Sequence, residues 1–291
     1  MIRKILRFFK RGLVYMFYGQ PVVHVNPSIS VVNRNDLLNG RTALITGGTS
    51  GIGKAMASAF MNAGANVIIT SRTKEKAEAI AKELSSSYPE RLVIGIELNN
   101  DDVDSFNNTF NSLLSIIGNN KIDILVNNAG VRGGRWGATS RSEYEQVMNT
   151  NLKGAFFLSE IVAKYMKENE IHGNILNICS ASSLRPANSA YCLSKWGLRA
   201  LTEGMAKTLI PYDIIVNGIA PGPTATPMFG FESSNNIEAS SQPNKRFTTV
   251  EEIANMAVIY VSDMARTIVG DIAYMTGGAA LLTYDDNSYE F

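Results

Sequence analysis

The chain has 291 residues, of which 45% are hydrophobic and 18% are charged, as in a soluble globular protein and unlike a disordered or fibrous chain. The formal net charge of +1 argues against a nucleic-acid-binding protein, which would show a strongly basic domain or stripe. Two cysteines and two distant histidines exclude a disulfide framework and predict no metal site. So few cysteines fit a reducing, cytoplasmic location.

Residues 1–18 predict a basic amphipathic helix, and the polar stretch that follows predicts a connecting arm to residue 40. The apolar run 13–18 is too short for a signal peptide or a membrane-spanning helix. Two interpretations stay open. The helix is either an interfacial anchor on anionic lipid, which would make the protein membrane-associated, or it packs on its own domain or on a partner subunit. Its basic residues are Arg3, Lys4, Arg7, Lys10 and Arg11.

Beyond residue 40, short β-branched runs alternate with longer stretches of helical periodicity. Near-continuous apolar runs are typical of strands buried on both faces, and helices between them imply right-handed parallel βαβ units. We therefore predict an α/β fold, a Rossmann-like doubly wound parallel sheet of about seven strands flanked by helices. The expected strands are residues 42–46, 66–70, 92–97, 122–127, 174–179, 214–220 and 271–275. No repeat or linker divides residues 41–291, which are predicted to form a single dinucleotide-binding catalytic domain with a C-terminal tail.

The first candidate site is the glycine-rich turn "TGGTSGIG", residues 46–53, which follows the first strand and opens a helix. In such sheets ligands bind at the carboxyl ends of the strands, and a turn of this kind presents backbone N–H groups and a helix dipole to a pyrophosphate. Two of the glycines permit the turn, and the last permits close packing of helix on strand. The candidate cofactor-binding residues here are Gly47, Thr49, Ser50, Gly51, Ile52 and Gly53.

The residues after the second strand indicate which dinucleotide is bound. A carboxylate that would hold a ribose hydroxyl is missing, because the chain reads Ser71 and Arg72 with no acid before Glu75. Guanidinium and hydroxyl donors bind a ribose phosphate, which a carboxylate would repel. This favours NADP(H) over NAD(H), with a solvated Arg72 at a helix start as the alternative.

Further motifs follow in a fixed order. They are "NNAG" at 127–130, "NTNLKG" with Asn151, "NICS" ending at Ser180, "YCLSK" at 191–195 and "APGPTAT" at 220–226. Together with the glycine-rich turn they resemble the short-chain dehydrogenases/reductases, in the form with a TGxxxGxG loop and a YxxxK pair. The resemblance runs from about Arg41 to Gly278.

The resemblance implies a set of site residues. Tyr191 would be the general acid/base, Lys195 its activator and ribose holder, Ser180 the group that orients the carbonyl or hydroxyl, and Asn151 the holder of a proton-relay water. Asn128, Ala129 and Gly130 would lie along the adenosine and ribose. The nicotinamide would be flanked by Pro221, Gly222, Thr224 and Thr226, and the adenine bordered by Glu97 and Leu98.

The chemistry of these side chains supports that assignment independently. A free tyrosine has a pKa of about 10 and is a poor base near neutrality. Lys195 lies one helical turn beyond Tyr191 on the same face, and its ammonium would stabilise the phenolate. Ser180 would act electrostatically, because a serine hydrolase needs a histidine that this region lacks. We therefore expect hydride transfer between NADP(H) and a ketone or secondary alcohol.

Substrate and partners are less strongly specified. Arginine and lysine in the loops after the fourth, fifth and sixth strands favour an anionic or sugar-like small molecule. Those residues are Arg132, Arg135, Arg185, Lys245 and Arg246. The alternatives are a membrane-surface reductase of a lipid or lipid-linked sugar and a non-catalytic nucleotide-binding scaffold. Cys179 and Cys192 are interpreted as packing residues rather than a redox pair. The tail 281–291 is expected at the subunit interface of a homodimer or homotetramer. The alternative is a frayed chain end.

Overall fold

The computed structural model describes residues 16, 36–226, 228, 230, 236–240 and 242–281. From residue 36 onwards these belong to one compact unit, Asn33–Phe291. Leu38 is fully buried and its N–H donates to the carbonyl of Ala63 at 2.7 Å, so the packed unit begins a few residues upstream of the boundary expected at residue 40. The expected N-terminal helix and arm lie outside the described residues apart from Met16 and residues 36–40, as does the tail beyond Leu281.

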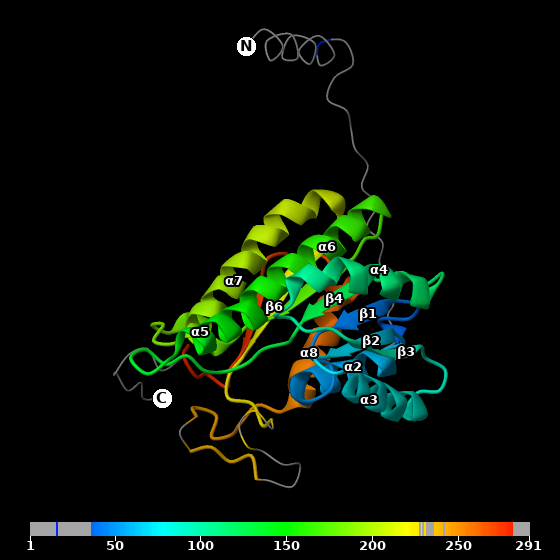
Figure 1. Cartoon of the computed structure of the whole chain (residues 1–291). Helices are drawn as coiled ribbons and strands as arrows, with labels where there is room; N and C mark the ends of the chain where they lie inside the picture. The colour runs from blue at the N-terminus through cyan, green and yellow to red at the C-terminus, as the bar shows by residue number, and fades with distance from the viewer. Residues whose placement is uncertain are drawn as a thin grey trace. The chain divides into compact units, whose positions relative to one another are not determined.

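The predicted parallel sheet is confirmed, with seven strands in the order β3-β2-β1-β4-β5-β6-β7 (Figure 1). The strands are β1 (Thr42–Ile45), β2 (Asn66–Ser71), β3 (Val93–Glu97), β4 (Ile124–Asn127), β5 (Asn174–Ile178), β6 (Ile215–Pro221) and β7 (Ile272–Met275). Every neighbouring pair is parallel. The strand order reverses between β1 and β4, which places a ligand-binding crevice at their carboxyl ends.

Helices cover both faces of the sheet (Figure 1). One face packs on α2 (Gly51–Asn62), α3 (Lys74–Ser87) and α8 (Val250–Val261), and the other on α4 (Phe106–Ile117), α5 (Arg141–Met148), α6 (Gly154–Glu168) and α7 (Ala190–Leu209). The side chains of β1 alternate between the two faces of the sheet. Ala43 and Ile45 lie in the hydrophobic core beside α2, α3 and α8, and Leu44 lies in the core beside α4, α6 and α7. Among the residues that the structure describes, no helix has the length and apolar character to cross a membrane.

Short helical turns join these elements at Val103–Ser105, Asn149–Lys153, Ala181–Leu184, Ile210–Tyr212 and Asp263–Ala265. The turn Asn149–Lys153 is a π-helical widening between α5 and α6. Such widenings are mostly single turns and are frequent at functional sites.

A buried polar network lies under the carboxyl edge of the sheet, inside strands that are otherwise apolar. The Asn127 amide donates to Ser159 Oγ and to Asn177 Oδ1, both at 2.8 Å, and the Asn177 amide donates to Thr202 Oγ1 at 2.8 Å. All four side chains are at most 3% exposed. Because buried polar networks fix a unique arrangement, this network sets the position of α7 on β4 and β5.

Gly95 on β3 should be intolerant of a side chain. A Cβ there would lie 2.2 Å from the carbonyl oxygen of Ala77 and 2.3 Å from its carbonyl carbon. Backbone atoms cannot rotate away, so α3 would have to shift. We expect Gly95→Ala to lower the free energy of unfolding by about 1–3 kcal/mol, measured by urea denaturation.

The matched control is Gly204→Ala on α7, where no atom lies within 4 Å of the new Cβ. Alanine in an exposed helix interior should be neutral or stabilise by up to about 1 kcal/mol. Equal denaturation midpoints for the two variants would contradict the close packing of β3 on α3.

Candidate active site

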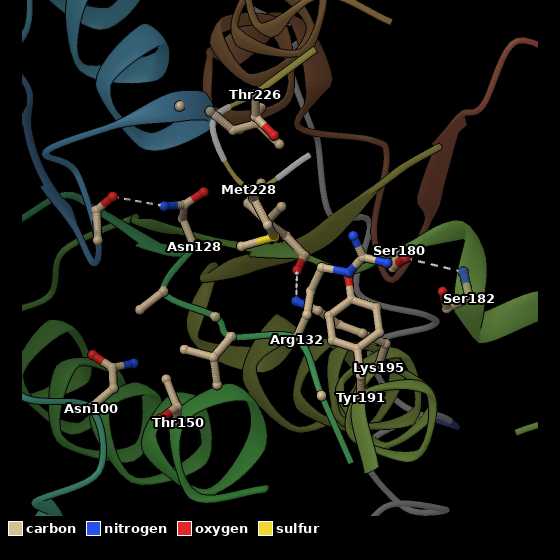
Figure 2. A pocket seen from close by; sticks show the side chains of 18 of the residues that line it. Asn100, Asn128, Arg132, Thr150, Ser180, Ser182, Tyr191, Lys195, Thr226 and Met228 are labelled. Carbon is tan, nitrogen blue, oxygen red and sulfur yellow. Dashed lines mark hydrogen bonds between the residues drawn. The ribbon is translucent and has the colours of Figure 1, made fainter. Parts of the chain in front are cut away.

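A cavity of about 890 Å³ runs along the carboxyl ends of the strands (Figure 2). Most of the predicted site residues line it, namely Gly47, Thr49, Ser50, Gly51, Ile52, Ser71, Arg72, Leu98, Asn128, Ala129, Gly130, Ser180, Tyr191, Lys195, Pro221, Gly222, Thr224 and Thr226. Three predicted residues do not line it: Gly53, Glu97 and Asn151. One continuous cavity therefore joins the glycine-rich turn to Tyr191.

The glycine-rich turn has the geometry of an anion cradle. Gly47 and Gly51 have φ of +62° and +51°, which glycine adopts without steric cost. A Cβ on Gly53 would lie 2.4 Å from the carbonyl oxygen of Gly47, so this glycine is needed for packing rather than for contact with a ligand. Ser50 precedes α2 without a side-chain cap, and the first turn carries no acid. The first N–H groups of α2 and its positive dipole end are thus available to a phosphate.

Asn128 shapes that turn, a structural role that the sequence did not predict. Its amide donates to the carbonyl oxygens of Thr46 and Gly47 at 2.9 and 3.1 Å. Thr46 Oγ1 in turn accepts from the N–H groups of Asn128 and Ala129, both at 3.0 Å. The ends of β1 and β4 are therefore joined at the point where the strand order reverses.

The loops after β2 and β3 form the next part of the cavity. Ser71, Arg72 and Lys76 all line it. Lys76 was missed by sequence reasoning, although its place in the first helical turn after Arg72 is a signal that could have found it. After β3 the lining residues are Leu98, Asn99, Asn100 and Asp101, whereas Glu97 is exposed and outside the cavity.

Tyr191 and Lys195 project from the first turns of α7, which begins at Ala190 after the capping residue Ser189. Lys195 is only 5% exposed, its ammonium donates to the carbonyl oxygen of Ile178 at 2.7 Å, and Nζ lies 5.9 Å from the centre of the Tyr191 ring. No ion pair between described residues involves Lys195.

Ser180 lies opposite this pair at the end of β5, and Figure 2 shows it at the same end of the pocket as Tyr191. Its Oγ accepts from the N–H of Ser182 at 3.1 Å, which leaves its own proton free to donate. Ser183 is fully buried, donates to the carbonyl oxygen of Ser180 at 2.7 Å and does not line the cavity. The geometry therefore favours Ser180 and Ser182 over Ser183 as substrate contacts.

Asn151 lies in the π-helical turn and is 1% exposed. Its amide donates to the carbonyl oxygen of Val131 at 2.9 Å and to Ser194 Oγ at 3.0 Å, and its Oδ1 accepts from Val131 N at 2.8 Å. Ser194 donates to the carbonyl oxygen of Tyr191 at 2.7 Å. The Asn151 side chain therefore connects the loop after β4 to the helix that carries Tyr191, and both of its amide hydrogens are used.

The two cysteines differ in environment. Cys179 is 2% exposed, and burial raises the pKa of its thiol to about 11, so it is an inert packing residue at neutral pH. Cys192 lines the cavity. No group of three His, Cys, Asp or Glu side chains within the described part of the chain is placed to hold a metal ion.

The wall of the cavity beside Tyr191 consists of two loops joined through their backbones. Gly133 O accepts from Tyr191 N at 3.3 Å, Gly134 O accepts from Ala190 N at 2.8 Å, and Trp136 N donates to Asn188 O at 2.9 Å. Residues 131–136 and 188–191, which we call the joined wall, therefore hold each other in place.

Glu143 on α5 supports the joined wall. Its Oε1 accepts from Gly134 N at 2.8 Å and its Oε2 from Thr139 Oγ1 at 3.0 Å. These bonds, the one from the Gly134 backbone first, lower the pKa of the Glu143 carboxyl. Both oxygens of the one carboxylate that lines this part of the cavity are thus already occupied.

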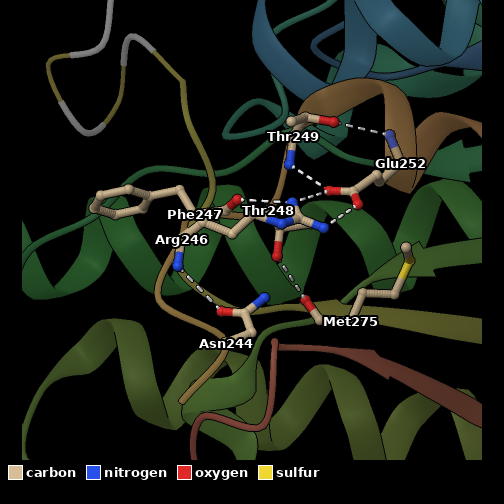
Figure 3. A network of polar contacts seen from close by, with 7 residues as sticks. All are labelled: Asn244, Arg246, Phe247, Thr248, Thr249, Glu252 and Met275. Atoms are coloured by element: carbon tan, nitrogen blue, oxygen red, sulfur yellow. Dashed lines mark hydrogen bonds and ion pairs between the residues drawn. The ribbon is translucent and has the colours of Figure 1, made fainter. Parts of the chain in front are cut away.

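The loop after β6 is anchored at its base (Figure 3). Thr248 N donates to Pro223 O, and Ala225 N to Thr248 O, both at 3.0 Å. Arg246 forms a bidentate pair with Glu252 at 2.6 and 2.8 Å, while Glu252 and Thr249 complete a reciprocal cap at the start of α8. Lys245 and Arg246, expected as substrate contacts, do not line the cavity. Arg246 is instead committed to the loop base.

This anchor should show in the pH dependence of stability. The Arg246 hydrogen bonds, followed by the one from Thr249 N, lower the pKa of Glu252 from 4.5 to about 2. A carboxyl with a depressed folded-state pKa stabilises the fold above its unfolded pKa, and this contribution is lost as the pH falls through the folded value. Glu252→Gln should therefore lower the urea midpoint at pH 7, and the difference from the wild type should shrink between pH 4.5 and 2.

Glu145→Gln is the control for this variant, because Glu145 pairs with Arg141 on the exposed surface of α5 and exposed pairs contribute little. A Glu252→Gln difference that is constant across this pH range would contradict the role given to the Glu252 carboxylate.

Comparison with known proteins identifies the family. A sequence model of the short chain dehydrogenases matches residues 41–237. The 3-oxoacyl-(acyl-carrier-protein) reductase FabG of Aquifex aeolicus (strain VF5) is 33% identical over 246 residues, which cover 83% of this chain and 98% of the relative. The 3alpha-hydroxysteroid dehydrogenase of Mediterraneibacter gnavus is 31% identical, with 84% and 98% covered. The chain belongs to the short-chain dehydrogenase/reductase family, as its motifs predicted.

Solved structures agree with this assignment. A putative short-chain alcohol dehydrogenase from Sinorhizobium meliloti 1021 superimposes with a TM-score of 0.74 at 32% identity, covering 83% of this chain and 96% of that one. A putative gluconate dehydrogenase from Agrobacterium tumefaciens gives a TM-score of 0.76 at 29% identity, with 84% and 97% covered. The protein is thus an oxidoreductase of this family acting on CH–OH or C=O groups.

Proposed function

We propose that the protein is an NADP(H)-dependent oxidoreductase that interconverts a ketone and a secondary alcohol, with Tyr191 as general acid/base. The observation that carries this proposal is the single cavity that joins the uncapped start of α2 to Tyr191 and the buried Lys195. A phosphate-binding end and a proton-transfer end in one cavity fit a dinucleotide and a carbonyl compound bound side by side.

The residues fit NADP(H) at the phosphate-binding end. The glycine-rich turn, with residues 47 and 49–52 lining the cavity, would hold the pyrophosphate. Ser71, Arg72 and Lys76 would bind the ribose 2′-phosphate, because two cations and a hydroxyl stand where an NAD site has a carboxylate. Residues 128–130 would lie along the adenosine and ribose, Leu98 beside the adenine, and residues 221–226 beside the nicotinamide. When bound, the nicotinamide supplies or accepts the hydride.

The protein's own groups would handle the proton and the substrate oxygen. Ser180 would donate a hydrogen bond to that oxygen, where negative charge develops. Tyr191 would give its phenolic proton to the oxygen in reduction, or remove one in oxidation. Lys195 would stabilise the phenolate through its ammonium charge. The side-chain amide of Asn151 donates both of its hydrogens to other groups of the protein. A relay water would therefore be held by the backbone of Asn151 rather than by its side chain.

The direct test is the loss of NADPH absorbance with purified protein and a panel of oxo-acids, oxo-sugars, acyl thioesters and neutral ketones. We expect carbonyl-dependent oxidation of NADPH and slower oxidation of NADH. The relatives named above are a 3-oxoacyl-(acyl-carrier-protein) reductase and a 3alpha-hydroxysteroid dehydrogenase, so the family alone does not select the substrate. NADPH binding without turnover of any carbonyl would instead support a nucleotide-binding scaffold.

Two proposals concern partners. Residues 1–18, basic and amphipathic, would lie on anionic membrane surfaces. Flotation with phosphatidylserine vesicles should recover the full chain and not a chain without these residues. The segment 281–291 would contact a second subunit in a homodimer or homotetramer, and deletion after Tyr284 should then lower the mass measured by light scattering. An unchanged mass would indicate a frayed end.

A further inference from the structure

We infer that the carbonyl substrate carries an anionic group, which the guanidinium groups of Arg135 and Arg185 bind at the substrate end of the cavity. The inference rests on the proposed function and names the substrate class of that site. Both arginines line the cavity. Arg185 follows β5, as Ser180 does, and Arg135 follows β4 in the segment whose backbone is bonded to Ala190 and Tyr191.

Guanidinium groups outnumber carboxylates in this part of the cavity. Arg132 adds a third guanidinium, and Figure 2 shows it at the end of the pocket that holds Tyr191. Two carboxylates line the cavity. Asp101 follows β3, the strand at the edge of the sheet beyond β1 and β2, and is therefore remote from the loops after β4 and β5. Glu143, the carboxylate on this side, has both oxygens bonded to Gly134 and Thr139.

Arg135 and Arg185 have no ion-pair partner within the described part of the chain, whereas Arg141, Arg199, Arg246 and Arg266 each pair with a carboxylate. A guanidinium presents a planar fork of donors that matches carboxylate and phosphate oxygens. These two guanidinium groups therefore keep N–H donors from which the oxygen atoms of an anionic ligand would accept hydrogen bonds.

The backbones that carry these side chains are held in place before any ligand binds. The backbone of Arg135 forms an isolated antiparallel β-bridge with that of Ser189 in the joined wall. The carbonyl oxygen of Arg185 accepts from the Trp196 indole N–H at 2.8 Å, which ties it to α7. Both side chains are exposed, but a fixed backbone lowers the conformational freedom that is lost when they bind a ligand.

The test uses pairs of carbonyl compounds of which one member is anionic and the other is neutral. The pairs are 3-oxobutanoate and its methyl ester, dihydroxyacetone phosphate and dihydroxyacetone, and acetoacetyl-coenzyme A and acetoacetyl-N-acetylcysteamine. They distinguish a carboxylate, a phosphate monoester and the phosphate groups of coenzyme A as the source of the charge. For each pair we compare kcat/KM with NADPH, and calorimetric Kd for the full-length enzyme saturated with NADP⁺.

We expect one charged member to be preferred over its neutral partner by about tenfold or more, as for charge-assisted hydrogen bonds. In the variant Arg135→Gln/Arg185→Gln that ratio should fall towards one. Arg141→Gln should keep the wild-type ratio, because Arg141 pairs with Glu145 outside the cavity. This ratio separates loss of anion binding from misfolding, because misfolding would lower kcat/KM for both members of a pair by the same factor.

The inference is overturned if no pair shows a preference in turnover or binding, or if the preference survives in the double variant. Turnover and binding are separate readouts. Absence of any carbonyl-dependent NADPH oxidation would count against the proposed function, while the calorimetric ratio would still decide whether the arginines bind the anion.

Discussion

Replacement of Tyr191 by phenylalanine should abolish carbonyl reduction while leaving NADPH binding intact. The change removes one oxygen atom from a side chain that lines the cavity. In the proposed mechanism the phenol is the proton donor to the substrate oxygen, and general acid/base catalysis typically contributes about 10² to 10⁴-fold. We expect kcat/KM for NADPH-dependent reduction to fall by that amount, and the Kd for NADPH, from fluorescence titration, to change less than twofold.

Tyr212→Phe is the matched control, since this tyrosine lies in the exposed turn Ile210–Tyr212 and does not line the cavity. It should retain wild-type turnover. A Tyr191→Phe enzyme with more than a tenth of wild-type activity would rule out the phenol as the main proton donor, and Ser180 would become the next group to examine.

The second large effect should come from replacing Arg72 with aspartate. The substitution removes a guanidinium from the end of β2 and places a carboxylate where an NAD site has one. The carboxylate would repel a 2′-phosphate and accept a hydrogen bond from a free ribose hydroxyl. We expect kcat/KM for NADPH to fall about 100-fold, the discrimination that charge-assisted contacts provide, and the value for NADH to rise.

Lys74→Gln controls for a nearby loss of positive charge, because Lys74 is two-thirds exposed, pairs with Glu78 and does not line the cavity. Lys76→Gln should lower kcat/KM for NADPH but not for NADH, and by less than Arg72→Asp does. If Arg72→Asp leaves the ratio of NADPH to NADH activity unchanged, Arg72 is a solvated residue and the cofactor preference must be set elsewhere.

The sheet and most of the candidate site were predictable because both depend on local sequence. Strands buried on both faces need continuous apolar runs, and these mark β1 to β7 within two residues at each end. Ligands bind where such strands end, so reading the residues after each strand pointed to Ser71, Ser180 and Tyr191.

The remaining contacts depend on tertiary structure that no local pattern encodes. Glu143 resembles an ordinary acid in the first turn of a helix, and its bond to Gly134 appears only when the loop after β4 folds back. Arg246 was expected in the cavity for its charge, but it pairs with Glu252, six positions further along the chain in α8. Asn151 was expected to hold a relay water, but it does not line the cavity, and its link to Ser194 requires the π-helical turn.

The joined wall limits how this enzyme can acquire new substrates. Gly133 and Gly134 are bonded to the backbone of Tyr191 and Ala190, so an insertion or deletion in residues 131–136 would displace the phenol itself. At this wall, specificity can diverge only by exchange of side chains such as Arg135. The segment between Thr226 and Thr248 is bonded across its base, so its length can change without moving Tyr191. Laboratory evolution should therefore yield point substitutions in the first segment and length variants in the second.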